Sequence, residues 1–238
     1  MEITYLNHSG FVIRLEKVAL LIDYFGEGSP VLEEVLADRS RKLYVLASHS
    51  HADHFDSSIL SFGDSHGNAV YVLSSDIRGA NSRLGVLSWP VNYLAQGDTY
   101  SDENLRIWAF GSTDQGISFL VEADGRKIFH AGDLNNWHWN EECGPDEADA
   151  FEANYLAELE KLALHSPEIY AVMFPVDPRL GKDFMRGPQQ FVERIKTAHF
   201  FPMHFGTGYS KVGQFKPYAK EYGAKFYEIT KTGQTFNL

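Results

Sequence analysis

The chain has 238 residues, of which 44% are hydrophobic and 22% charged, and it carries a formal net charge of −11 at pH 7. This composition is ordinary for a globular protein of one large or two small domains. The acidic balance argues against a nucleic-acid partner held on a broad basic surface.

Cys143 is the one cysteine, so neither an internal disulfide nor a thiolate metal cluster is expected. No run approaches the roughly 18 apolar residues of a membrane span, and no basic stretch followed by an apolar one opens the chain. We therefore expect a soluble, cytoplasmic protein without a membrane partner.

The first half of the chain is dominated by strand patterns. Short apolar or alternating runs predict strands at residues 2–6, 11–15, 18–22, 43–47, 69–73, 86–96 and 105–110. The turn-rich residues 7–10 make the first two a hairpin. Pro30 favours a short helix through Leu36 after a loop at 26–30, and residues 61–68 read as a loop.

The second half mixes strands and helices. Asp124-Gly125 is a strong turn signal and predicts a hairpin between strands at 117–122 and 127–129. The remaining patterns predict helices at 146–164 and 188–197 and strands at 170–175, 199–203 and 226–229, before a last segment around Gly233. With no repeat and no low-complexity linker, we expect one domain over residues 1–238, of mixed α and β structure.

The residues after the strand at 43–47 carry the strongest chemical signal. His49, His51, Asp53 and His54 fall within six positions, and Asp56-Ser57-Ser58 then predicts a helix start. In extended backbone His49 and His51 point the same way, so one cation can take both. Asp53 and His54 follow at the turn and can reach a second cation. Imidazole nitrogen and carboxylate oxygen suit Zn²⁺, and H-x-H-x-D-H is too specific for a merely His-rich polar loop.

This motif resembles that of the metallo-β-lactamase superfamily. Ile22-Asp23, His130-Ala131-Gly132-Asp133 and Pro202-Met203-His204-Phe205 follow in the order that this family uses. The opening residues 3–11 resemble the branch that contains ascorbate-6-phosphate lactonase and N-acyl-phosphatidylethanolamine phospholipase D. The resemblance implies an α+β fold, a four-layer αββα sandwich, and two divalent metal ions.

By the same resemblance, Asp133 is the carboxylate that bridges the two metals and His204 is the last ligand histidine. Taken alone, the first would read as a solvated loop residue and the second as a hydrogen-bonded core histidine. A further family histidine is absent, because His66 lies too early in the chain. Asp114 is the natural substitute, unless it merely binds water. We expect Zn²⁺, and an oxygen-richer site would also suit Mn²⁺ or Fe²⁺.

Two residues near the metal motif have predicted supporting roles. Asp23 is expected to fix the ring of a ligand histidine. His8 is expected to line the pocket and donate to a substrate oxygen, with a partly exposed turn histidine as the alternative. His130 reads equally as a packing or a catalytic residue.

Two stretches look like pocket walls. Trp137 and His138 lie in an aromatic, amide-rich segment that either covers a cleft or forms a buried plug. Asp177 and Arg179 follow a predicted buried strand between two prolines. Arg179 either clamps a phosphate or carboxylate with two donors or pairs internally with Asp177.

The sequence therefore predicts a metal-dependent hydrolase that uses a metal-activated hydroxide on a small, anionic ester, lactone or phosphodiester. Asp53 is expected to orient the hydroxide and to protonate the leaving group. Three alternative functions stay open. The first is a nuclease or phosphodiesterase, which the acidic net charge disfavours, and the second is a di-iron oxidoreductase, whose additional flavin domain does not fit this chain length. The third is a metal-binding sensor without catalytic activity. Self-association as a homo-oligomer also stays open.

Overall fold

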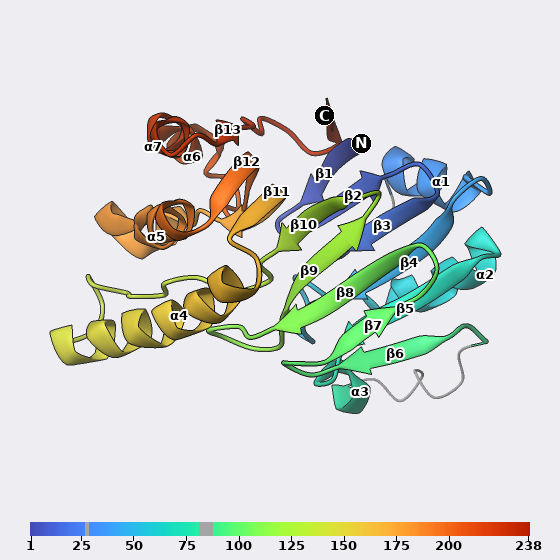
Figure 1. The fold of residues 1–238 in the computed structure, drawn as a ribbon, viewed down its shortest axis with the longest axis horizontal. Coiled ribbons are helices and arrows are strands. Elements are labelled where there is room, and N and C mark those ends of the chain that lie inside the picture. The colour runs from blue at the N-terminus through green and yellow to red at the C-terminus, as the bar shows by residue number, and fades with distance from the viewer. Residues whose placement is uncertain (27–28, 81–87) are drawn as a thin grey trace.

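The computed structural model describes residues 1–26, 29–80 and 88–238, and two seven-stranded sheets dominate it (Figure 1). The strands of the first sheet are, in spatial order, β14 (Gln234–Asn237), β1 (Glu2–Asn7), β2 (Gly10–Arg14), β3 (Val18–Ile22), β4 (Lys42–Ala47), β5 (Ala69–Ser74) and β6 (Val91–Leu94). Those of the second are β13 (Lys225–Phe226), β12 (Lys196–Met203), β11 (Glu168–Pro175), β10 (Arg126–His130), β9 (Ser118–Ala123), β8 (Leu105–Phe110) and β7 (Thr99–Ser101).

Helices cover the outer face of each sheet. The first sheet carries α1 (Pro30–Ala37), η1 (Ser57–Ser61), α2 (Phe62–His66) and α3 (Ile77–Ala80). The second carries α4 (Pro145–His165), η3 (Pro178–Asp183), α5 (Arg186–Arg194), α6 (Tyr209–Val212), η4 (Gly213–Phe215) and α7 (Lys216–Glu221). The chain thus forms the four-layer αββα sandwich that the sequence predicted, and α4 is its longest helix (Figure 1).

Alternation along the strands of the first sheet builds two cores. Phe11 and Ile13 of β2 belong to the core between the sheets, whereas Val12 packs with α1 and α2 on the other side. Tyr44 and Val45 of β4 divide in the same way. Because both faces are covered, these strands read as continuous apolar runs, which is why the sequence revealed them.

Strand direction decides where polar side chains collect. Strands β3 to β6 run parallel in the first sheet, and β10 to β13 run parallel in the second. The residues that follow β3, β4, β10 and β12 include Asp23, His49, Asp133 and His204. In open α/β sheets ligands bind outside the carboxyl ends of the strands, and these residues lie at such ends.

Most predicted elements are confirmed, including both hairpins, the helix from Pro30 and the long helix α4. The predicted loop at 61–68 is wrong, because it contains α2, a helix of little more than one turn that buries Phe62 and His66. Such a helix is too short to show a 3.6-residue period.

Other helices and strands differ from the predicted ones because segments far apart in the chain pair with each other. The predicted helix at 188–197 ends at Arg194, since Lys196 already pairs with Glu168 in parallel β12 and β11. Strands β7 and β14 were not predicted; β14 is ordered by pairing with β1 from the other end of the chain. In the strand predicted at 226–229, Phe226 pairs and the rest does not. Within predicted segments, residues 27–28 and 86–87 lie outside the described residues.

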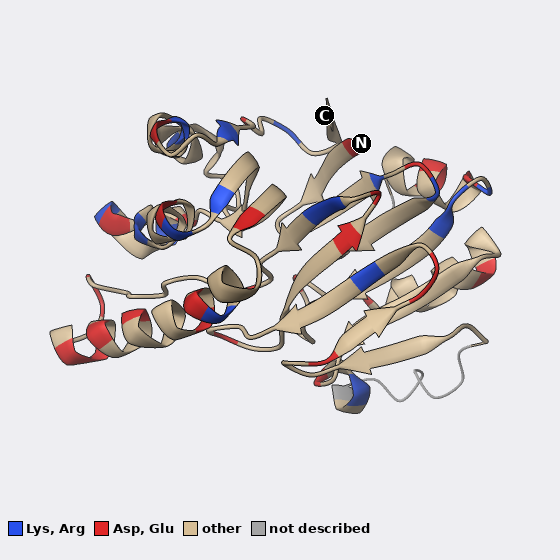
Figure 2. Ribbon diagram, in the orientation of Figure 1, with Lys and Arg blue, Asp and Glu red and all other residues tan. Residues whose placement is uncertain are grey.

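Charged residues of both signs are spread along the ribbon, and acidic residues recur along α4 (Figure 2). None of the helices in the described ranges combines the length and apolarity required to cross a bilayer.

A polar cluster around Asp102 joins the two sheets. Asp102 follows β7 in the second sheet, and its Oδ2 accepts from the Tyr44 hydroxyl at 2.5 Å and the Lys42 ammonium at 2.9 Å, both on β4 of the first sheet. The Tyr100 hydroxyl donates to the same oxygen at 3.0 Å. Burial works to raise the pKa of Asp102, but these donors prevail and lower it to about 2.

We predict that Asp102→Asn lowers the free energy of unfolding at pH 7 by about 1–3 kcal/mol, because it weakens a cluster of charge-assisted hydrogen bonds. The folded pKa lies below the unfolded value of about 3.9, so this contribution is present above pH ~4 and is lost as the pH falls toward 2. Urea denaturation across this range measures both effects. Glu103→Gln, in a side chain that is 74% exposed and 3.5 Å from Lys42, is the control and should change little. A pH-independent difference would contradict the assignment.

Candidate metal centre

Asp23 holds the loop that carries the metal motif. Its Oδ1 accepts the Ser48 backbone N–H at 2.7 Å, and its Oδ2 accepts the Ser48 hydroxyl at 2.7 Å. The same Oδ2 lies 2.8 Å from Nδ1 of His54. The fully buried Asp23 therefore occupies the place predicted for it, beside the ring of a histidine of the motif.

Candidate ligand atoms gather in two groups. One consists of His49, His51 and Asp133, and the other of His8, Asp53, His54 and His204; within each group the donor atoms lie within 4.8 Å of one another. The structure thus brings together six of the seven residues predicted as metal ligands and adds His8, which the sequence placed in the pocket.

Asp133 lies between the groups. Its Oδ2 is 3.4 Å from Nε2 of His49. Its Oδ1 is 3.2 Å from Nε2 of His54 and 3.4 Å from Nε2 of His204. Each carboxylate oxygen therefore faces a different group, which is the arrangement that a bridging ligand requires.

The donor atoms are arranged to bind divalent cations rather than to form hydrogen bonds with one another. Nε2 of His8, His49 and His54 and Oδ1 of Asp133 are buried without a hydrogen-bond partner. Zinc donors at about 2.0–2.1 Å define a tetrahedron with edges of about 3.3 Å. The separations of 3.2–3.4 Å around Asp133 match these edges. Unpaired buried polar atoms are costly, so their convergence indicates a cation site.

Three ligand histidines have their second ring nitrogen fixed by a neighbour. Nδ1 of His54 donates to Asp23, Nδ1 of His204 to Oδ2 of Asp177 at 2.9 Å, and Nδ1 of His49 to the Ser48 hydroxyl oxygen at 3.0 Å. With Nδ1 as the donor, each ring turns Nε2 toward Asp133, and Nε2 is the nitrogen that a cation would bind.

Asp177 lies at the cavity beside the second ligand group, and its polar contacts are internal. Only 1% of its side chain is exposed, and besides His204 it accepts from Nε of Arg179 at 2.9 Å and Nη2 at 2.5 Å. The internal Asp177–Arg179 ion pair, the alternative raised from the sequence, is therefore present. Arg179 itself remains 63% exposed.

Burial and charge divide the histidines into two kinds. Burial lowers the pKa values of His8 and His49, so both rings are neutral near pH 7, the form that binds metal. Burial also works against the charged form of His54, but Asp133 and Asp23 prevail and raise its pKa to about 10. The nearby His54 and His204 outweigh burial at Asp133 and lower its pKa. A cation at this place would take over the role of the proton on His54.

Asp114 does not join either group. It is exposed, and its backbone N–H donates to the Ser112 hydroxyl at 3.3 Å. The physical reason lies in the adjacent chain, where Gly116 packs so closely on the metal loop that a Cβ there would lie 2.1 Å from the Ser48 carbonyl oxygen. The segment contacts the loop through its residues 115–117 and presents Asp114 to solvent.

Trp137 and His138 form a buried plug rather than a wall of the cavity described below. Trp137 donates from Nε1 to the Asp133 carbonyl at 2.8 Å, and its ring meets that of His204 edge-on at 5.2 Å. His138 is buried and lies 3.2 Å from the Asp183 carbonyl. His130 is likewise buried, with Nε2 2.8 Å from the Ser9 carbonyl, and therefore has a packing role.

Sequence reasoning missed Ser48, Asp76 and Gln115, which support the loop from outside the motif. Asp76 accepts the Ser50 backbone N–H at 2.8 Å, and Gln115 donates to both Asp76 and the Ser50 hydroxyl at 2.7 Å. The one signal in the sequence for these residues was the position of Asp76, which follows strand β5 in the same way as Asp23 follows strand β3.

A cavity of about 470 Å³ adjoins the second ligand group. Its lining consists of His8, Asp177, Pro178, Arg179, His204, Phe205, Gly206, Thr207, Gly208 and Lys211. Two lining side chains, Arg179 and Lys211, are cationic. The cavity is thus placed to hold a molecule against His8 and His204.

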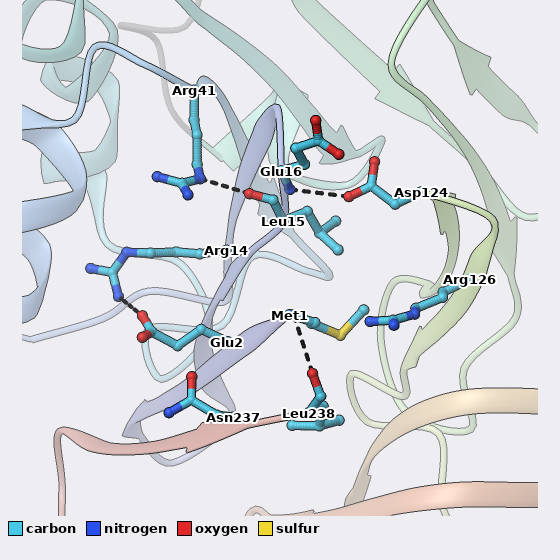
Figure 3. A pocket seen from close by; sticks show the side chains of 10 residues that line it. All are labelled: Met1, Glu2, Arg14, Leu15, Glu16, Arg41, Asp124, Arg126, Asn237 and Leu238. Atoms are coloured by element: carbon cyan, nitrogen blue, oxygen red, sulfur yellow. Dashed lines mark hydrogen bonds and ion pairs between the residues drawn. The ribbon is translucent and has the colours of Figure 1, made fainter.

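A second cavity, of about 520 Å³, lies at the opposite ends of the strands, beside the β2–β3 and β9–β10 turns (Figure 3). Two of its cationic side chains already have protein partners: Arg14 lies 2.5 Å from Glu2, and Nε of Arg41 donates to the Leu15 carbonyl at 2.6 Å. Strand direction separates this cavity from the ligand groups, so it is not part of the candidate metal centre.

Proteins with similar sequences or folds support this architecture. The chain is 28% identical over 251 residues to a UPF0173 metal-dependent hydrolase of Symbiobacterium thermophilum and 27% identical over 257 residues to one of Pyrococcus furiosus, with 100% of each chain covered. A solved metallo hydrolase of the archaeon Ignicoccus hospitalis has the same fold, with a TM-score of 0.70, 17% identity, and coverage of 100% of this chain and 98% of that one. The narrower resemblance to the lactonase and phospholipase branch stays a prediction.

Residues 2–147, more than half of the chain, match the sequence family described as the β-lactamase superfamily domain. They contain β1 to β10, Asp23, the metal loop and Asp133. The chain therefore belongs to the metallo-β-lactamase superfamily.

Proposed function

We propose that this protein is a metal-dependent hydrolase of small anionic esters, lactones or phosphodiesters, and that it holds two divalent cations. The observation that carries the proposal is the position of Asp133, whose two oxygens face unpaired imidazole nitrogens of both ligand groups. Nitrogen and oxygen donors favour Zn²⁺ and also suit Mn²⁺ or Fe²⁺. Relatives named metal-dependent hydrolases support the same reaction class.

The composition of the first group suits catalysis. His49, His51 and Asp133 would supply three protein donors, and zinc sites with three protein ligands keep an open position, unlike the closed four-ligand structural sites. When bound, a cation pair supplies Lewis acidity, which lowers the pKa of water and stabilises developing negative charge.

Asp53 is the carboxylate available for proton transfer. Its side chain is 50% exposed, and its Oδ2 lies 3.3 Å from Nε2 of His8. The contact with His8 is the largest influence that holds the pKa of Asp53 below its ordinary value. Asp53 is therefore ionised at neutral pH, as a base that accepts a proton and later returns it to the leaving group must be.

The charges around the cavity favour an anionic substrate. Arg179 uses its Nε and Nη2 for Asp177, so its Nη1 is available to a ligand. Lys211 lies on α6 and makes no ion pair with any described residue. These two cationic side chains in the cavity lining would attract a carboxylate or phosphate group held beside His8 and His204.

A test of the function combines metal analysis of the purified full chain with a screen of lactones, carboxylic esters and phosphodiesters, before and after chelation. The proposal expects two metals per chain and hydrolysis that chelation abolishes. Stoichiometric metal without turnover on any substrate class would favour a metal-binding sensor instead. Hydrolysis by the metal-free protein would refute the proposal.

Asp133→Ala should reduce the bound metal from two ions per chain to fewer than one, because the change removes a donor from both groups. Loss of even an outer partner of a metal ligand typically costs about 10–100-fold, so we expect the hydrolysis rate to fall by more than about 100-fold. Plasma mass spectrometry and steady-state kinetics measure the two effects. Asp114→Ala, an exposed carboxylate outside both groups, is the control and should keep two metals. Full metal content in Asp133→Ala would contradict the bridging assignment.

Lys211→Met should raise KM for a carboxylate-bearing ester by about 2–5-fold, as expected for loss of an exposed ion pair. The KM for its neutral methyl ester should stay unchanged, and kcat should change little for either. Lys220→Met, on α7 and away from the cavity, serves as the matched control. An equal effect of Lys211→Met on both esters would show that this lysine does not recognise substrate charge.

A further inference from the structure

The turn between β1 and β2 is held at its tip by the second sheet. The His8 carbonyl accepts the backbone N–H of His204, which follows β12, at 3.1 Å. The Ser9 carbonyl accepts the Nε2–H of His130, the last residue of β10, at 2.8 Å. Both contacts join strands that lie far apart in the sequence, so the fold fixes the position of His8.

The ring of His8 packs inside the second ligand group. Its centroid lies 4.1 Å from that of His204, and it meets the ring of His54 edge-on at 5.3 Å. Its Nε2 is buried and lies 3.3 Å from Oδ2 of Asp53. One donor atom from each of these four residues lies within 4.8 Å of the other three, so a single cation can contact all of them.

Distances in this centre separate hydrogen bonds from contacts between ligands of one cation. The three imidazole Nδ1 atoms that have hydrogen-bond partners lie 2.8–3.0 Å from them. The imidazole Nε2 atoms that face Asp133 lie 3.2–3.4 Å from its oxygens. The 3.3 Å between His8 and Asp53 belongs to the second kind and matches the edge of about 3.3 Å between two ligands of one zinc ion. A charge-assisted N–H···O bond is shorter, about 2.7–2.9 Å.

We infer that His8 is a ligand of the second cation through its Nε2, and that this makes the second site the tighter of the two. This inference rests on the proposed metal function. With His8 the second group offers three imidazole nitrogens and one carboxylate before Asp133 is counted, whereas the first group offers two imidazoles beside Asp133. The ion in the second site is therefore held in a closed set of protein donors, and the ion in the first site keeps the open position.

The same assignment accounts for the donor that the first site lacks. The family resemblance led us to expect a further histidine there, and Asp114, its predicted substitute, joins neither ligand group of the described residues. His8 adds a histidine to the other site instead, so the two ions are held unequally. Burial lowers the pKa of His8, so its ring is neutral near pH 7, the form that binds metal.

Zinc titration of the full chain labelled with ¹⁵N-histidine, followed by NMR of the imidazole nitrogens, tests the inference. The chain has ten histidines, and a zinc-bound ring nitrogen differs in chemical shift from one that carries a proton. With two equivalents of Zn²⁺ we expect zinc-bound nitrogens on His8 and on the four other candidate ligand histidines, five in all. With one equivalent, the signals of His8, His54 and His204 should move first. If His8 only donates to Asp53, its Nε2 carries a proton and four histidines bind zinc.

His8→Asn identifies the His8 signal and measures what the ligand contributes. Asparagine adopts the left-handed backbone of this position, φ 49°, more readily than most residues, so the turn is kept and the imidazole is removed. Loss of even an outer partner of a metal ligand costs about 10–100-fold. We therefore expect the tighter Zn²⁺ to bind at least about 10-fold more weakly in competition with a chelator, and the weaker one to change little.

His199→Asn is the matched control. His199 is partly buried like His8, and its Nδ1 lies 2.9 Å from the Tyr227 hydroxyl, but it belongs to neither ligand group. This variant should keep both Zn²⁺ affinities and all five zinc-bound signals.

The outcomes separate the two proposals. Four zinc-bound histidines in a wild-type chain that holds two Zn²⁺ ions would overturn the role of His8 and leave the proposed function standing. This count comes from the wild type, so it decides the question even if His8→Asn does not fold. Signals of His49 and His51 that move before that of His8 would overturn the assigned order of affinity. A wild-type chain that binds no Zn²⁺ would overturn the proposed function together with this inference.

Discussion

The centre of this structure depends on one buried carboxylate. Asp133 is 4% exposed and comes from the second sheet, whereas His49 and His54, which face its two oxygens, come from the first. Apolar packing between the sheets brings these groups to within 3.2–3.4 Å, and it leaves their polar atoms without hydrogen-bond partners. A cation bound there would relieve this cost and join the two sheets, so metal affinity and folding stability are coupled in this architecture.

The same region holds strained backbone. His8, Asp23 and His204 have φ values of 49°, 47° and 60°, a left-handed conformation that costs non-glycine residues about 1–2 kcal/mol each. Hydrogen bonds hold them there: the Asp23 N–H donates to the Leu46 carbonyl at 3.0 Å, and the His204 N–H donates to the His8 carbonyl at 3.1 Å. These turns aim side chains from the ends of three strands at one point, and their concentration at the candidate centre is typical of functional sites.

A structural feature could be predicted from the sequence when its signal lies within one short segment of the chain. Strands buried on both faces appear as apolar runs, and four ligand candidates fall in one motif, so both were accessible without a structure. The roles of Asp177 and Asp76 were not, because each depends on which strand lies beside which: Asp177 meets His204 across parallel β11 and β12, and Asp76 meets Ser50 across β4 and β5. Strand β14 shows the same limit, since β1 pairs with it from the far end of the chain.

Asp177 also connects the candidate metal centre with the cavity beside it. One buried carboxylate accepts from both Nδ1 of His204 and the guanidinium of Arg179, and these donors outweigh burial and lower its pKa to about 2. An anion bound by Arg179 would compete with Asp177 for the guanidinium, and Asp177 would then bond more strongly to His204. A stronger bond at Nδ1 makes the ring a better electron donor through Nε2. Through Asp177, the charge of an anion bound in the cavity would thus influence the basicity of His204.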